Sequence, residues 1–139
     1  MTIPVWVLLG FAAWTVLLLV GTVGAYRWRR ILAGRASVRE WRADLDQGDE
    51  RYRRAMRAHA NCVENLPVYT AIVVAMVATG VQGPALDALA VLLLAARIIH
   101  SLVHVVPEQT EAVATLRFAF FFVQFLCLLA MGVIVAVRA

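Results

Sequence analysis

The sequence predicts an all-α integral membrane protein, a bundle of four transmembrane helices. Hydrophobic residues make up 63% of the 139 residues, whereas soluble domains have roughly 45–50%. The mean hydropathy of +0.79 is correspondingly high. The chain also contains four apolar runs, each of about 20 residues, the length that crosses a hydrocarbon core of about 30 Å. We therefore expect one membrane domain over residues 1–139.

The predicted spans cover approximately residues 3–26, 61–80, 84–104 and 114–137. The first is a retained span rather than a signal peptide, because its apolar run exceeds the usual 7 to about 15 residues and its positive charges follow it. The segment "GVQGP" separates the second and third spans, and "VPEQT" separates the third and fourth. Both segments carry turn-forming residues, and such short links predict antiparallel neighbouring helices.

The distribution of arginine predicts the orientation of the chain. All thirteen basic residues are arginine, and ten of them lie between Arg27 and Arg57, giving a net charge of +4. In a soluble chain this charge would suggest nucleic acid, but among hydrophobic segments it is the bias that orients a membrane protein. We expect no nucleic-acid partner, a cytoplasmic loop over residues 27–53, and both termini away from the cytoplasm. The end of this loop is expected to lead into a cytoplasmic extension of the second helix, with most of its charges solvated.

The two cysteines, Cys62 and Cys127, lie in different spans at different depths, which disfavours a disulfide. Arg57 and His59 precede Cys62, and nearby cations can activate a thiol. Small buried filler is nevertheless the default interpretation of both residues.

Polar residues at membrane depth are the strongest indication of function, because they are costly there and usually face a bundle interior. Arg57, Asn61 and Glu64 follow one another at helical spacing in the second span, so they share one face. His59 projects elsewhere around that helix.

A second set of polar residues lies in the third and fourth spans. Arg97, His100 and His104 form one stripe, and Arg117 opens the fourth span. In the predicted topology these residues and the first set lie in the same half of the bilayer, where they can converge. Arg97 is deeper than the others, by roughly 10 Å, so it needs an anionic partner, and Glu64 is the expected one.

Several guanidinium groups, imidazoles and one carboxylate suit a small ligand with excess carboxylates and one ammonium group. An Arg–Glu pair that only fixes helix packing is an alternative, but it leaves the other polar residues unexplained. A metal site is disfavoured because Arg97 on the stripe of His100 and His104 would repel a cation. A channel or transporter is disfavoured because the cluster occupies only one half of the membrane.

The motifs "RAHANCVEN" (residues 57–65) and "AARIIH" (residues 95–100) resemble the R-A-H-x-N-x-x-E-N and A-R-x-x-H patterns of the MAPEG family, the membrane-associated proteins in eicosanoid and glutathione metabolism. The resemblance extends over essentially the whole chain. It implies a homotrimer that binds glutathione from the cytoplasmic side at subunit boundaries. It also implies glutathione-binding roles for the residues that match the motifs: Arg57, His59, Asn61, Glu64, Arg97 and His100.

The resemblance implies catalytic roles as well. Arg117 is similar to the family arginine that stabilises the glutathione thiolate, although the preceding loop is longer here. His104 stands where family enzymes commonly have a tyrosine, and both side chains can hydrogen-bond a ligand.

We therefore expect a membrane-bound transferase or peroxidase that uses glutathione, or a related small thiol, as co-substrate and needs no metal. Its second substrate would be an apolar electrophile or lipid hydroperoxide from the bilayer. A non-catalytic lipid-binding or scaffold protein of the same fold is the alternative. The membrane is either a bacterial inner membrane or the endoplasmic reticulum.

Overall fold

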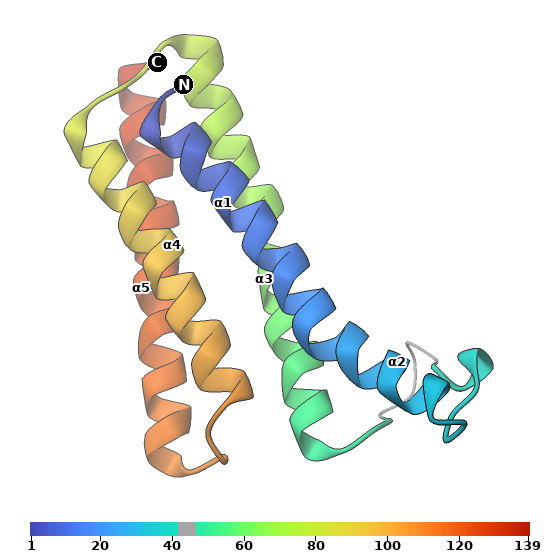
Figure 1. Ribbon diagram of the computed structural model, residues 1–139. Coiled ribbons are helices and arrows are strands. Elements are labelled where there is room, and N and C mark those ends of the chain that lie inside the picture. The colour runs from blue at the N-terminus through green and yellow to red at the C-terminus, as the bar shows by residue number, and fades with distance from the viewer. Residues whose placement is uncertain (42–46) are drawn as a thin grey trace.

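The computed structural model describes residues 1–41 and 47–139, and within these ranges the chain is helical with no strand. Residues 42–46, part of the predicted loop, lie outside the described residues. The elements are α1 (Ile3–Leu18), a π-helical turn η1 (Leu19–Gly24), α2 (Ala25–Leu32), a short 3-10 turn η2 (Val38–Glu40), α3 (Glu50–Thr79), α4 (Pro84–Val105) and α5 (Glu111–Arg138). The first three elements follow one another as one long helical rod (Figure 1).

Four helices in the described part of the chain are long and apolar enough to cross a membrane: Ile3–Leu32, Glu50–Thr79, Pro84–Val105 and Glu111–Arg138. This confirms the predicted all-α membrane fold. The first helix continues past residue 26 to Leu32. Helix α3 begins at Glu50, which confirms the expected extension of the second helix ahead of its apolar span. Part of the predicted loop over residues 27–53 is therefore helical, because hydropathy marks where lipid contact begins and a helix can extend beyond that point into water.

Local chemistry sets the helix ends. The Asp49 carboxylate accepts a hydrogen bond of 2.8 Å from the backbone N–H of Tyr52 and so caps the start of α3. Thr110 caps α5 in the same way, through the N–H of Val113 at 3.2 Å. Gly80 ends α3 with a φ of 71°, a left-handed conformation that glycine adopts without a steric penalty.

Helix α4 is central to the bundle, because it packs against α1, α3 and α5. Apolar side chains fill this core, and Phe11, Leu86, Ala90, Leu93 and Met131 are almost completely buried. Gly10 allows α1 to approach α4 closely, since an added Cβ would lie 3.1 Å from the side chain of Leu94.

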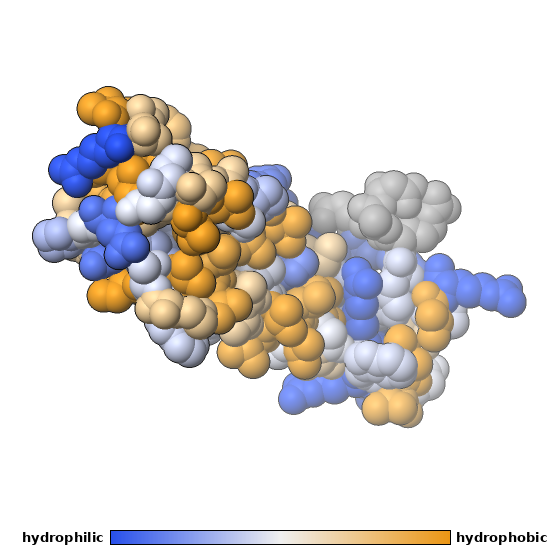
Figure 2. Space-filling view, turned by 90° about the horizontal axis from the view of Figure 1, so that it is seen from above, coloured by the Kyte–Doolittle hydropathy of each residue, from blue (hydrophilic) through white to orange (hydrophobic). Residues whose placement is uncertain are grey.

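Many large apolar side chains remain on the outside of the bundle, and in the view from above orange hydrophobic residues lie among blue and white hydrophilic ones (Figure 2). This surface suits a lipid environment. Both chain termini lie at one end of the bundle (Figure 1). The opposite end, formed by α2, η2 and the start of α3, is called the arginine-rich end below.

Candidate functional site

The buried polar side chains of α4 form one stripe: Arg97, His100, Ser101 and His104 are all at most 6% exposed. Their spacing places them on a single helical face, and this face is turned toward the other three long helices. The prediction that Arg97, His100 and His104 share one face is therefore confirmed, and Ser101 joins them. We call these four residues the α4 polar stripe.

Arg97 is a fully enclosed cation, with 0% of its surface exposed. Its Nη1 atom donates to Nδ1 of His100 at 3.3 Å, and its guanidinium carbon lies 5.6 Å from the ring centre of Phe11. Its Nε and Nη2 atoms have no hydrogen-bond partner among the described residues. The charge and the free N–H groups of this buried guanidinium make the surroundings of the α4 polar stripe strongly polar.

The predicted ion pair between Arg97 and Glu64 is not formed within residues 1–41 and 47–139. Glu64 interacts electrostatically with Arg97, but its side chain is exposed and the Arg97 Nε and Nη2 atoms stay unpaired. Hydration of the exposed carboxylate competes with a contact in the core. The expectation is therefore wrong as a direct contact.

His100 and His104 pack edge to face, with ring centres 4.9 Å apart and planes at 85°. Nδ2 of Asn61, on α3, lies 3.4 Å from Nε2 of His104. The other ring nitrogen of His104, Nδ1, is buried without a partner in the described part of the chain. The stripe thus contacts α3 at Asn61. This agrees with the expectation that the polar residues of the second span meet those of the third.

Ser101 connects the stripe to α1 and α3. Its hydroxyl accepts from the indole N–H of Trp14 at 3.2 Å and donates to the carbonyl of Arg97 at 2.9 Å. The sulfur of Cys62 lies 3.6 Å from the same oxygen. Sequence reasoning missed Ser101 and Trp14 as members of this network, although Ser101 follows Arg97 by one helical turn. Cys127 is buried, in agreement with its interpretation as filler.

Helix α5 contributes Gln124 to this region. Its side chain is 2% exposed, and its Nε2 donates to the carbonyl of Phe120 at 2.7 Å and to that of Ala96 at 3.5 Å. Its Oε1 has no partner among the residues that the structure describes. Gln124 therefore links α5 to α4 close to Arg97.

Among the described residues, no hydrogen bond or ion pair joins Arg57, His59 or Arg117 to the stripe. Arg57 and Arg117 both interact electrostatically with His104, and Arg117 also with His100. Arg57 is exposed, whereas His59 and Arg117 are partly exposed. Three guanidinium groups, those of Arg57, Arg97 and Arg117, thus act on the ring of His104.

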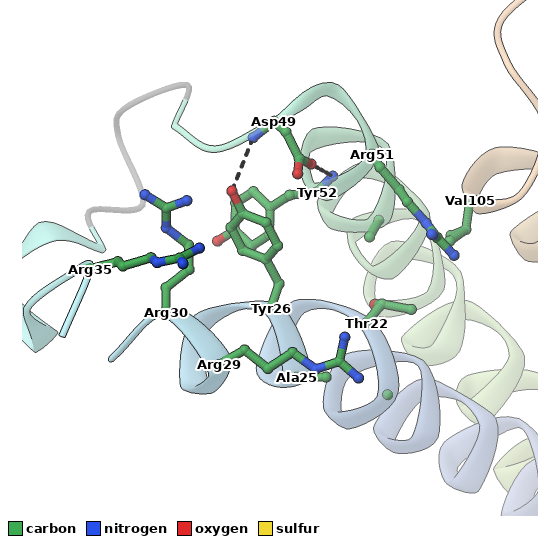
Figure 3. Close-up of a pocket in the computed structure, with 12 residues that line it drawn as sticks. Thr22, Ala25, Tyr26, Arg29, Arg30, Arg35, Asp49, Arg51, Tyr52 and Val105 are labelled. Carbon is green, nitrogen blue, oxygen red and sulfur yellow. Dashed lines mark hydrogen bonds between the residues drawn. The ribbon is translucent and has the colours of Figure 1, made fainter. Parts of the chain in front are cut away.

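A second polar site, which sequence reasoning missed, lies at the arginine-rich end (Figure 3). It is a cavity of about 520 Å³ whose lining includes Arg29, Arg30, Arg35 and Arg51. Tyr26 and Tyr52 stack within it, with ring centres 4.6 Å apart. The acidic residue in its lining, Asp49, caps the start of α3 through its carboxylate. The positive charge of the four arginines therefore remains able to attract anions. The alternating charges of this segment pointed instead to a solvated face.

A four-helix apolar bundle with a buried polar cluster defines a multi-pass integral membrane protein. The family model described as "MAPEG family" matches residues 4–137, so the chain belongs to the MAPEG family. Membership supports, in general terms, a membrane protein of glutathione or eicosanoid metabolism. No match is found among curated proteins or among solved structures.

Proposed function

We propose that this protein is a membrane-bound glutathione transferase or peroxidase that acts on apolar electrophiles or lipid hydroperoxides. One observation carries the proposal: the α4 polar stripe encloses the Arg97 guanidinium, which contacts His100, next to His104, whose Nδ1 atom is buried without a partner in the described part of the chain. Positive charge and N–H donors without acceptors stabilise a thiolate. Glutathione supplies a thiol together with two carboxylates and one ammonium group.

The proposed role of each site residue depends on whether its side chain is exposed or buried. Arg57 is exposed and contacts a glutathione carboxylate directly, while exposed Glu64 receives the ammonium group. Arg97 has 0% exposure, so it acts through its contact with His100 and through the electrostatic field of its positive charge. This differs from the expectation that Arg97 contacts a glutathione carboxylate directly. His59 and Asn61 shape the site from α3.

The thiolate is formed when the bound thiol loses its proton to water, and Arg117 and His104 stabilise the resulting charge. With an electrophile, the sulfur forms a bond to carbon and the leaving group departs. With a hydroperoxide, the sulfur attacks the terminal oxygen, which yields an alcohol and a sulfenic acid. A second thiol then reduces the sulfenic acid to a disulfide and water.

Apolar substrates would reach the thiolate laterally, along α5. Phe118, Phe121, Phe122 and Phe125 are all exposed on this helix, and neighbouring rings in this set stack on one another. The ring of Phe121 lies 6.5 Å from that of His100. This aromatic surface therefore connects the lipid-facing side of α5 to the α4 polar stripe.

The test is thiol binding and turnover by the purified protein in detergent. Wild-type protein is expected to bind glutathione, to show the ultraviolet absorbance of a bound thiolate, and to conjugate an apolar electrophile or reduce a lipid hydroperoxide. A panel of other cellular thiols identifies the natural one. The proposal fails if the protein neither binds a thiol nor catalyses a thiol-dependent reaction.

Arg117→Ala separates the enzyme from the alternative, a non-catalytic lipid-binding or scaffold protein. In an enzyme this change removes a positive charge near the thiolate, so we expect the thiolate absorbance and kcat to fall by about tenfold or more, the cost of one charged hydrogen bond. Arg138→Ala, at the opposite end of the bundle, is the control. A scaffold would have no thiolate absorbance to lose.

A further inference from the structure

Two hydrogen bonds indicate that the two histidines of the α4 polar stripe carry their ring protons on different nitrogen atoms. Arginine can only donate, so the contact of 3.3 Å from Arg97 Nη1 makes Nδ1 of His100 an acceptor. The ring proton of His100 is then on Nε2. The amide nitrogen of Asn61 faces Nε2 of His104 at 3.4 Å. Because an amide NH₂ donates, Nε2 of His104 accepts, and its ring proton is on Nδ1.

The Nδ1–H group of His104 is an enclosed donor. His104 is 6% exposed, and Nδ1 has no acceptor among the described residues. The charged groups that act on the ring are the guanidinium groups of Arg57, Arg97 and Arg117, which are donors only. A buried donor that has no acceptor among the described residues requires one from outside the chain.

The environment also holds the ring of His104 in place. On one side His100 packs against it edge to face at 4.9 Å, and Arg97 fixes His100 in turn. On the other side Asn61 contacts Nε2. The orientation of the free Nδ1–H group is therefore set by two neighbours, one from its own helix and one from α3.

We propose that Asn61 is a positioning residue that fixes His104 in its Nδ1–H tautomer, so that Nδ1 presents one N–H donor to the thiolate of the bound thiol. The identity of the acceptor rests on the proposed function. The tautomer of His104 does not, because it follows from contacts within the chain.

The first experiment tests the tautomer without any ligand. The protein contains three histidines, so ¹⁵N-histidine NMR in lipid or detergent, with His59→Gln to simplify the spectrum, resolves His100 and His104. We expect the proton on Nε2 of His100 and on Nδ1 of His104. A proton on Nε2 of His104 would mean that the Asn61 amide is turned and accepts, and this would overturn the proposal.

A pair of asparagine variants tests the role of Asn61. Asn61→Leu is expected to leave His104 as a mixture of both tautomers. Asn65→Leu is the matched control, since the Asn65 amide donates to the backbone carbonyl of Asn61 at 2.8 Å rather than to a histidine. If His104 keeps its Nδ1–H tautomer in Asn61→Leu, Asn61 does not position it.

The second experiment tests the donor with glutathione bound. Asparagine places its amide near the position of histidine Nδ1, and glutamine places its amide near that of Nε2. We expect His104→Asn to retain thiolate absorbance and His104→Gln to lose about tenfold in the thiolate-to-thiol ratio, as for one hydrogen bond to a charged group. Equal losses in both variants would overturn the donor role. Absence of thiol binding by the wild type would instead refute the proposed function, and with it the thiolate as acceptor.

Discussion

Arg97 shows how one residue organises the interior of this bundle. A charged side chain at the centre of a transmembrane helix costs about 2.5–3.5 kcal/mol on insertion scales, and Arg97 is completely enclosed. The ring of Phe11 faces its guanidinium group, and His100 accepts one of its N–H groups. These contacts reduce the cost of burial, while the N–H groups that they leave free supply the polarity of the site.

Ser101 is the residue on which the surrounding network depends, because its hydroxyl both accepts from Trp14 and donates to the Arg97 carbonyl. We expect Ser101→Ala to lower the unfolding free energy by about 1–3 kcal/mol, since the buried indole N–H loses its acceptor. Thermal unfolding in detergent measures the change. Thr79→Ala is the control, because its exposed hydroxyl bonds only within its own helix. An equal loss in both variants would contradict a special role for Ser101.

At the scale of single elements, the π-helical turn η1 keeps the first long helix aligned with the bundle. The buried residues of α1 recur every three or four positions, through Phe11 and Thr15 to Leu18. The next buried residue, Val23, follows Leu18 by five positions, which is one residue more than the regular spacing. The wider π turn accommodates this extra residue, so Val23 still faces the core. The hydroxyl of Thr22 contacts the carbonyl of Leu18 within the same turn.

The start of α3 depends on its cap. We expect Asp49→Ala to lower stability by about 1 kcal/mol, because the first backbone N–H groups of the helix lose their acceptor. Faster hydrogen exchange of the first turn of α3 would show this directly. Asp49→Ser keeps a capping oxygen while removing the charge, so it should exchange almost like the wild type. Fast exchange in the serine variant would instead show that the negative charge of Asp49, rather than its capping oxygen, stabilises the start of α3.

At the scale of the whole molecule, the exposed charges of α3 argue for association. Arg57 and Glu64 are exposed, although both interact with the buried α4 polar stripe. A charge facing lipid is costly, so another copy of the chain is expected to cover the face of α3 that carries Glu64 and, one turn before the predicted span, Arg57. The family resemblance leads us to propose three copies.

Native mass spectrometry of protein released from detergent tests this association. We expect a complex of three chains of 15.3 kDa each. Arg57→Ala should increase the fraction of monomer, whereas Arg138→Ala, at the other end of the bundle, should not. A wild-type protein that remains monomeric at every concentration would contradict this prediction.

The placement of both termini at one end (Figure 1) also makes the orientation in the membrane testable. The arginine-rich end should face the cytoplasm, because positive charge is retained there. Ser37→Cys should therefore react with a membrane-impermeant maleimide only from the cytoplasmic side, and Thr2→Cys only from the other side. The native cysteines are both buried, so they give a low background. Reversed labelling would invert the predicted topology.

The sequence alone determined the helical membrane fold and most of the polar cluster, for two physical reasons. Length and apolarity are properties of each segment by itself, so the four spans were predictable from local pattern. Helical spacing likewise placed Arg97, His100 and His104 on one face without any knowledge of their neighbours.

Only the tertiary structure decided which groups meet between helices. Glu64 was expected to pair with Arg97 but is exposed, whereas Trp14 and Ser101, 87 positions apart in the chain, share a hydrogen bond. The cavity at the arginine-rich end likewise combines residues from α2, α3 and the end of α4. Such contacts depend on how helices rotate and approach one another, and that is set by packing across the whole core rather than by any local pattern.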